Sequence, residues 1–209
     1  MTRLLAAGHR GLLVECDDLP EVMALHRALE EARAGGALPG VVDLVPAART
    51  VLVTFDETAS HSRIAEALAA LEVRPRDDDP TGREVQVDVS YGGDDLDEVA
   101  RLSGLSVEEV VRRHAAATYV VAFTGFAPGF AYLVGGDPAL VVPRRDTPRT
   151  RVPRGSVALA GEFTGIYPQE GPGGWQLIGR TEAPLWDLDR EPPALLAPGT
   201  RVRFARLDP

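Results

Sequence analysis

Residues 122–181 read AFTGFAPGFAYLVGGDPALVVPRRDTPRTRVPRGSVALAGEFTGIYPQEGPGGWQLIGRT and hold 11 of the chain's 21 glycines. From Tyr119 onward, short apolar segments alternate with Gly and Pro turns and none has a helical period; examples are YVVAF, SVALA, WQLIG and RVRFA. This pattern is typical of a β-barrel or a β-sandwich. The tail, residues 185–209, is expected to close that fold with a strand containing Val202 and Phe204.

The same stretch is locally cationic in an acidic protein. It carries six arginines and four acidic residues, a net charge of +2, whereas the whole chain is −9 and the remainder is −11. Guanidinium groups and exposed backbone N–H groups both suit a carboxylate or a phosphate. The stretch therefore predicts where an anionic small molecule binds. The alternative is a loop-rich β domain whose arginines are solvated.

The N-terminal half mixes strand and helix signals. In chain order the predicted elements are strands at 3–7 and 11–16, a helix at 17–35, a hairpin at 41–55, a helix capped by Ser60 or Ser62, and a strand at 85–89. The order β-α-β-β-α-β predicts a ferredoxin-like α/β domain over residues 1–90. The predicted fold class is α+β.

Residues 91–209 are predicted to form the second domain, which begins with a helical connector at about 94–117. Asp94 or Asp95 begins a short helix that ends at Gly104. Ser106 and Glu109 have the spacing of a capping box for the next helix. The barrel follows this connector.

Four motifs follow one another in the cationic stretch: Gly125-Phe126-x-Pro128-Gly129-Phe130-x-Tyr132-Leu133, Pro143-Arg144-Arg145-x-x-Pro148-Arg149-x-x-Val152-Pro153-x-Gly155-Ser156-Val157, Thr164-Gly165-Ile166-Tyr167-Pro168, and Pro172-Gly173-Gly174-Trp175-x-Leu177-Ile178-Gly179-Arg180-Thr181. In this order they resemble the family of the 5-oxoprolinase B-type subunit, also known as allophanate hydrolase subunit 1, carboxyltransferase subdomains C and D, or a sporulation-kinase inhibitor. The resemblance extends more weakly over nearly the whole chain. It implies that the barrel is cyclophilin-like.

The second motif belongs to a run of five arginines within eleven residues, Arg144, Arg145, Arg149, Arg151 and Arg154, spaced by three prolines. Because proline fixes φ and removes a donor, this segment presents its guanidinium groups in a stiff, extended form. We expect Arg144, Arg145 and Arg149 to contact a ligand or partner. At least one of the five is expected to be solvated or to bind a neighbouring protein chain.

The last two motifs supply further candidates for binding an anion or substrate. Their glycines allow close approach of backbone to a ligand, and successive N–H groups form an anion nest or an oxyanion hole. The alternative is that such turns only reverse the chain. The candidates are Gly165, Tyr167, Gln169, Gly173, Gly174 and Arg180.

Aromatic residues near these turns predict a pocket wall or a partner contact. Phe126 and Phe130 flank Pro128 in a hydrophobic loop that covers a pocket or docks a partner. Trp175 either lines a pocket or packs in the core.

Two residues are candidates for catalysis. Glu162 stands where the family has a neutral Gly-Gln pair, and a carboxylate there could serve as a general base. His114 shares a helical apolar stripe with Val107, Val110 and Val111, which is more typical of a partly buried residue than of a catalyst. The family, however, also has a histidine just ahead of its Tyr-containing strand. Together with Gln169-Glu170-Gly171 and Glu182, the departure at Glu162 leaves the precise substrate open.

Composition excludes several kinds of chemistry. The chain has no lysine, so a Walker A loop, a Schiff-base enzyme, a biotin-carrying lysine and a lysine-assisted amidase are all excluded. Four histidines and one cysteine show no metal-ligand spacing, and we expect no metal. A pI near 5.0 argues against nucleic acid or an anionic membrane as partner. With no secretory or membrane-spanning segment expected, the protein is predicted to be cytoplasmic.

The resemblance implies one part of an ATP-dependent 5-oxoprolinase, which opens 5-oxo-L-proline to L-glutamate together with a C-type partner and an A-type partner. Without a nucleotide motif of its own, the chain is expected to be inactive alone, and its contact with ATP stays open. One alternative is a regulatory protein that inhibits a sensor histidine kinase. Another is an allophanate or urea amidolyase-like carboxyltransferase component.

Overall fold

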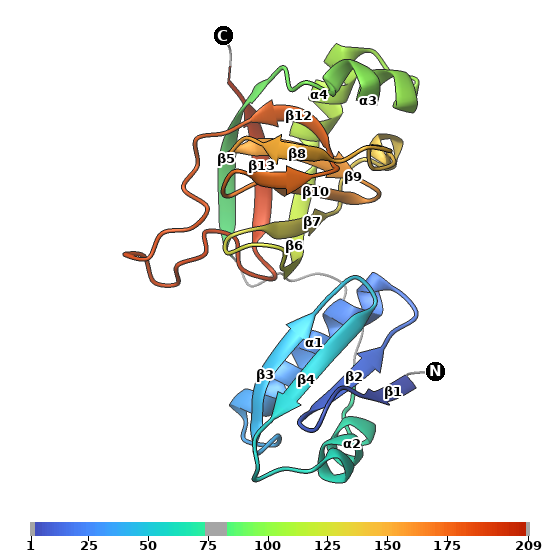
Figure 1. Ribbon diagram of the computed structural model, residues 1–209, viewed down its shortest axis with the longest axis vertical. Helices are drawn as coiled ribbons and strands as arrows, with labels where there is room; N and C mark the ends of the chain where they lie inside the picture. Colours follow the sequence, from blue (N-terminus) through green and yellow to red (C-terminus); the bar gives the residue numbers. More distant parts are fainter. Residues whose placement is uncertain (1–2, 74–82, 208–209) are drawn as a thin grey trace. The chain divides into compact units, whose positions relative to one another are not determined.

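The computed structural model describes residues 3–73 and 83–207 (Figure 1). The chain divides into two compact units, residues 1–79 and 80–209. Within the described ranges no helix has both the length and the apolar character needed to cross a membrane.

The N-terminal unit is a four-stranded antiparallel sheet with two helices. Its elements are β1 (Arg3–Ala6), β2 (Gly11–Glu15), α1 (Leu19–Ala34), β3 (Val41–Pro46), β4 (Thr50–Phe55) and α2 (His61–Ala69). The strands lie in the order β1-β2-β4-β3. Helix α1 packs against β3 and β4, and α2 packs against β2 (Figure 1).

Capping side chains begin both helices. The Asp18 carboxylate accepts the Glu21 backbone N–H at 2.9 Å, which satisfies one free donor in the first turn of α1. The predicted inner face of this helix, Val22, Leu25 and Leu29, is buried. Of the two candidate caps for α2, Ser60 is the one that accepts a backbone N–H, from Arg63 at 3.4 Å.

The ferredoxin-like order predicted for residues 1–90 is not what the structure has. The strand expected at 85–89 is β5 (Glu84–Tyr91), and it pairs with β12 and β13 of the second unit instead of with the N-terminal sheet. The edge position beside β2 is taken by β1, which reaches it through a hairpin that needs only a short connection. The N-terminal unit is therefore ββαββα, and the boundary at residue 90 falls at the end of a barrel strand.

The second unit contains a closed barrel, which confirms the predicted β-barrel. Its seven strands follow the order β10-β7-β6-β13-β5-β12-β9. They are β5, β6 (Thr118–Thr124), β7 (Ala131–Val134), β9 (Ser156–Ala160), β10 (Phe163–Ile166), β12 (Gln176–Arg180) and β13 (Arg201–Arg206). β13, which carries Val202 and Phe204, lies parallel to β5 and antiparallel to β6, so the C-terminal strand closes the barrel as expected.

Two helices and a small sheet stand on this barrel (Figure 1). Helices α3 (Leu96–Ser103) and α4 (Val107–Ala116) pack on each other, α3 against β12 and α4 against β13. Gly104 ends α3 in the left-handed region at φ 70°, and the Ser106 hydroxyl accepts the Glu109 N–H at 3.2 Å. A 3-10 turn (Pro138–Leu140) and the two-stranded sheet of β8 (Arg149–Val152) and β11 (Gly171–Gly173) complete the unit.

Candidate functional site

Asp95 is the anchor of the predicted arginine segment. Asp95 directly precedes α3 and is only 2% exposed. Its backbone N–H donates to Leu177 O at 2.9 Å. The carboxylate accepts two parallel hydrogen bonds from Arg149, at 2.8 and 2.9 Å, one from Arg145, and one from the Leu177 N–H at 2.7 Å. One carboxylate thus joins α3, β12 and residues 145–149.

The ionisation of Asp95 follows from these contacts. Burial alone raises the pKa of a carboxyl group. Here the hydrogen bonds from Arg149 and from the Leu177 N–H, together with the charges of both arginines, outweigh burial and lower the pKa of Asp95. Asp95 therefore stays ionised at neutral pH and keeps both guanidinium groups in place.

Three of the five arginines in this segment pair with carboxylates of the same chain. Arg145 and Arg149 share Asp95, and Arg151 pairs with Glu170 at 2.7 Å. Arg144 instead places its guanidinium carbon 6.0 Å from the centroid of the Trp175 ring, a cation–π distance. The stiff segment that the prolines predict is present, but two of the three arginines expected to contact a ligand bind a carboxylate of their own chain.

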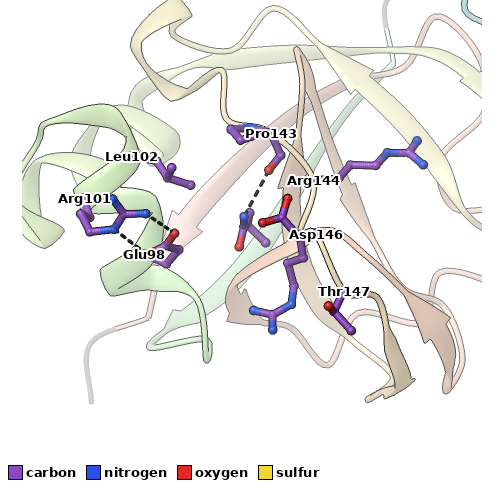
Figure 2. A pocket seen from close by; sticks show the side chains of 9 residues that line it. Glu98, Arg101, Leu102, Pro143, Arg144, Asp146 and Thr147 are labelled. Atoms are coloured by element: carbon purple, nitrogen blue, oxygen red, sulfur yellow. Dashed lines mark hydrogen bonds and ion pairs between the residues drawn. The ribbon is translucent and has the colours of Figure 1, made fainter.

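A cavity of about 360 Å³ lies between α3 and residues 143–147, above the start of β12 (Figure 2). Its lining residues are Glu98, Arg101, Leu102, Pro143, Arg144, Arg145, Asp146, Thr147 and Gln176. In Figure 2, Arg101 reaches from α3 and holds Glu98, whereas Arg144 extends away from that ion pair. The polar lining suits a small molecule that carries both hydrogen-bond donors and acceptors.

Two buried polar atoms of this lining have no hydrogen-bond partner. Gln176 is 3% exposed and donates through Nε2 to Pro143 O at 3.2 Å, but its Oε1 accepts nothing. The Nε of Arg145 is likewise buried and unpaired. Buried polar groups are almost always satisfied, so these two atoms, closed to solvent behind the cavity lining, are exceptions.

The aromatic residues form a cluster of their own. Phe130, Tyr132, Tyr167 and Trp175 pack edge to face with ring centroids 5.1–5.5 Å apart, and Phe130, Tyr167 and Trp175 are buried. Burial raises the pKa of Tyr167, although the Trp175 N–H and the charges of Arg144 and Arg149 lower it in part. Of the two interpretations of Trp175, packing in the core is the one the structure has.

The glycines near this cluster make room for rings. A Cβ at Gly165 would lie 2.9 Å from Trp175 and 3.0 Å from Phe130, and one at Gly173 would lie 2.7 Å from Tyr167 Cζ. Gly174 faces Pro148 at ordinary contact distance. At Gly165 and Gly173 the close approach is therefore to aromatic side chains of the same chain.

The loop between β6 and β7 holds Phe126 in an uncommon conformation. Its φ is +67°, and its side chain is 62% exposed while it touches Phe130 and Tyr167 edge-on, with ring centroids 5.3 and 6.1 Å away. Pro128 in the same loop is exposed. Phe126 therefore combines backbone strain with a largely exposed ring.

The two catalytic candidates lie apart from this cavity. Glu162 is exposed in the turn between β9 and β10 and lines a different cavity of about 240 Å³ with Tyr119 and Thr164. His114 is fully buried; its Nδ1 lies 2.7 Å from the Tyr91 hydroxyl and its Nε2 3.4 Å from Thr164 Oγ1. Burial lowers the pKa of His114 to about 3, so its ring is neutral and serves the core.

The remaining candidates lie on open surface. Gln169 is exposed in the turn before β11. Arg180 ends β12 with an exposed side chain 3.4 Å from Glu182 and borders a further cavity with Gln86. Within residues 3–73 and 83–207, no three His, Cys, Asp or Glu side chains gather in a way that could hold a metal ion.

Sequence reasoning missed the two residues that organise the site. Asp95 was expected only as a helix start, and Gln176 only as the variable position after Trp175. Asp95 is the N-cap residue of α3, but its side chain caps no backbone N–H and binds the two arginines instead. Nothing local marked Gln176, because its partners are set by the fold.

Comparison with known proteins places these features in a family. The model of the carboxyltransferase domain, subdomain C and D, matches residues 2–196. The B-type subunit of 5-oxoprolinase from Bacillus subtilis (strain 168) is 38% identical over 184 residues, covering 81% of this chain and 77% of its own. That of Escherichia coli O157:H7 is 42% identical over 178 residues, covering 80% and 78%. The resemblance carried by the four motifs is thereby confirmed.

Solved structures share the fold. The crystal structure of TTHA0988 has a TM-score of 0.80 at 39% identity; the match covers 96% of this chain but only 40% of that longer one. The Kluyveromyces lactis urea amidolyase has a TM-score of 0.77 at 21% identity, covering 99% of this chain and 15% of that one. At such an identity the second match shows the fold alone.

Proposed function

Because this chain belongs to the family of the carboxyltransferase domain, subdomain C and D, we propose that it is the B-type subunit of an ATP-dependent 5-oxoprolinase. The observation that carries the proposal is the identity of 38–42% to proteins that bear this name, over about four fifths of this chain. The proposed reaction opens 5-oxo-L-proline to L-glutamate. The proposed partners are the C-type and A-type proteins of the same enzyme, called the C-type partner and the A-type partner below.

The chemistry explains why several chains would be needed. The lactam is an unstrained amide, and water attacks its carbon slowly unless the amide oxygen is first made a better acceptor of electrons. ATP would supply that activation. With no lysine in its sequence, this chain offers no phosphate loop of the Walker A kind. Its contribution is to bind and orient the amide, using the cavity between α3 and residues 143–147.

Two features support a role within a larger enzyme in place of an independent one. The buried ion cluster of Asp95, Arg145 and Arg149 holds residues 143–149 in a fixed shape. Phe126 exposes an apolar ring at a cost in backbone strain, as expected of a residue that contacts another chain. The carboxyltransferase alternative is supported by the family model and by the urea amidolyase of Saccharomyces cerevisiae, which is 32% identical over 117 residues, but that match covers only 52% of this chain.

The decisive experiment measures glutamate released from 5-oxo-L-proline and ATP in three mixtures. These are this chain alone, the C-type and A-type partners without it, and all three together. We expect release only in the complete mixture. Turnover by the isolated chain would overturn its non-autonomous role, and a stable complex without turnover would favour another amide substrate or the regulatory alternative.

A binding assay separates the regulatory alternative. The tagged chain is mixed with its C-type partner and, separately, with the cytoplasmic part of a sensor histidine kinase, and each complex is measured by size-exclusion chromatography. We expect a complex with the C-type partner. Recovery of the kinase alone, without an effect on 5-oxo-L-proline turnover, would contradict the proposed enzymatic role.

A further inference from the structure

Two loops of the second unit present large apolar side chains to solvent. Leu188, in the segment between β12 and β13, is 79% exposed, and Phe126, between β6 and β7, is 62% exposed. These are the two highest values for large apolar side chains among the described residues. Trp186 is a further 42% exposed. Single exposed apolar side chains are ordinary, but a group of them on one surface marks a contact with another molecule.

The two loops touch each other at Gly129. A Cβ on this residue would lie 3.0 Å from Trp186 Cβ and 3.2 Å from Leu185 O. The φ of Gly129 is +85°, so its lack of a side chain serves both the turn and this close approach. Phe126 and Trp186 therefore stand on adjoining segments. We call residues 125–130 and 184–194 the paired loops.

The second of the paired loops is ordered by Arg190. Its guanidinium donates to three main-chain carbonyl groups of the same loop, at 2.6–3.3 Å: those of Pro184, Leu185 and Pro193. The Leu195 N–H closes the base of the loop by donating to Leu185 O at 2.9 Å, and the Leu185 side chain is buried in the barrel core. Figure 1 shows this segment standing out from the barrel between β12 and β13. A loop already held in one shape loses little conformational entropy when it binds a partner.

The rim of this apolar surface is acidic. Residues 187–191 contain Asp187, Asp189 and Glu191 against Arg190, a net charge of −2. Asp189 and Glu191 are exposed. An apolar centre with a negative rim is complemented by a protein surface whose apolar patch is rimmed by lysine or arginine.

We propose that the paired loops bind the C-type partner, through an apolar patch of that protein rimmed by basic side chains. The proposal rests on the proposed function and locates the surface on which the assembly depends. The matched fold makes up only 40% of the TTHA0988 chain, so in that protein further polypeptide accompanies it. A second copy of this chain fits less well, because a two-fold contact brings two acidic loops together. An anionic membrane repels the same rim.

Calorimetric titration of the chain with the C-type partner tests the paired loops. Trp186→Ala keeps the Cβ beside Gly129 and removes the ring, and we expect Kd to rise about 10- to 100-fold, as for an aromatic anchor of an interface. Leu188→Ala should raise Kd about 3- to 10-fold, because leucine contributes less than tryptophan at such anchors. Val141→Ala is the matched control, since Val141 is 56% exposed and lies in neither loop. Wild-type Kd in both loop variants, or equal weakening in Val141→Ala, would overturn the proposal.

The exposure of Leu188 keeps this test decisive. A substitution at so exposed a side chain changes the stability of the fold little, so Leu188→Ala decides if the thermal melting curve shows that Trp186→Ala has unfolded.

Arg190→Met tests whether the shape of the loop matters. The variant keeps a long side chain but removes three hydrogen bonds to main-chain carbonyl groups. As a positioning residue, Arg190 should affect Kd through the loop. We therefore expect weaker binding together with faster hydrogen exchange of the Asp187 and Leu195 N–H groups, which donate across the loop. Faster exchange with wild-type affinity would contradict the role of the ordered loop.

Turnover of 5-oxo-L-proline in the complete mixture separates this surface from the proposed function. Turnover and binding by the wild-type chain, with equal Kd in the loop variants, would overturn the surface and leave the function intact. Absence of both binding and turnover with the wild-type chain would overturn the two together.

Two measurements on the isolated chain test the other occupants. They are light scattering after size-exclusion chromatography, and sedimentation with vesicles of phosphatidylcholine and phosphatidylserine. We expect neither a dimer nor vesicle binding through the paired loops. A dimer or vesicle binding that is lost in Trp186→Ala would assign the surface to a second copy or to a membrane, and would overturn the proposal.

Discussion

Two buried polar clusters in the second unit differ in how completely their hydrogen bonds are satisfied. In the barrel core, His114 has a partner for each ring nitrogen and is surrounded by Tyr91, Tyr119 and Phe204. In the arginine cluster, which consists of Asp95, Arg145, Arg149 and Gln176, Asp95 is satisfied but one donor and one acceptor are not. The network around His114 is complete, whereas the arginine cluster leaves two buried atoms unsatisfied, which costs stability.

The largest expected loss of stability comes from a substitution at Asp95, the centre of the arginine cluster. Asp95→Asn removes the charge that holds two guanidinium groups, and we expect the free energy of unfolding to fall by about 2–3 kcal/mol. The loss is smaller than for a fully enclosed ion pair, because Arg145 and Arg149 retain some access to water. Denaturant unfolding measures it. Asp94→Asn is the control, since Asp94 is exposed and lies 3.7 Å from Arg149; an equal loss in both variants would contradict the role of Asp95.

The same variant, Asp95→Asn, also tests how stability depends on acidic pH. The folded pKa of Asp95 is lowered, so its contribution to stability is present above the ordinary carboxyl pKa of about 4 and is lost as pH falls through the folded value. Asp95→Asn should therefore have a flatter decline in stability below pH 4 than the wild-type chain.

His114 in the barrel core should make stability depend on pH over a higher range than Asp95 does. The pKa of His114 is about 3 in the folded state because of burial, against about 6.5 when unfolded. The unfolded chain thus binds a proton first, and stability should fall by about 1.4 kcal/mol per pH unit from pH 6.5 downward. Burial also lowers the pKa of His26, which adds to the decline.

Two variants test the His114 contribution. Urea unfolding of His114→Gln and of the exposed control His9→Gln, each at pH 7 and pH 5, compares slopes rather than absolute stabilities. We expect the difference between the two pH values to shrink in His114→Gln and to persist in His9→Gln. Unchanged pH dependence in His114→Gln would show that the ring is not held neutral.

Two glycine-to-alanine variants test whether Gly173 is needed to pack Tyr167. A methyl group at residue 173 would meet the Tyr167 ring, so Gly173→Ala should destabilise the chain by about 2 kcal/mol. Gly171→Ala, two residues earlier in β11, meets nothing within 4 Å and should change stability little. Thermal unfolding of both variants measures the difference. Equal melting temperatures would show that Gly173 does not serve to seat Tyr167.

These particular residues also show what a sequence can predict. Ser60, Ser106 and Gly104 marked helix ends correctly because capping depends on residues three or four positions away. The barrel was predictable because apolar segments and turns repeat along the chain. The place of β5 was not, since pairing with β13 joins residues more than 100 positions apart, and nothing near β5 distinguishes that partner from an N-terminal one.

The site was predicted in outline and missed in its contacts. The stretch that holds the cavity wall was found from its arginines and prolines. Their partner Asp95 lies 50 and 54 positions away from Arg145 and Arg149, and the Leu177 N–H lies 82 positions from Asp95. Local pattern therefore identified cations but could not show that a carboxylate already held two of them.

The smallest expected effect concerns Phe126, where strain and exposure coincide. A non-glycine residue in the left-handed region costs about 1–2 kcal/mol, so Phe126→Gly should be about 1 kcal/mol more stable than Phe126→Ala, although both lose the same ring contacts. If the ring contacts the C-type partner, both variants should bind that partner equally weakly despite their different stabilities. Calorimetric titration with the partner measures this, and wild-type affinity in both variants would show that the ring is exposed for another reason.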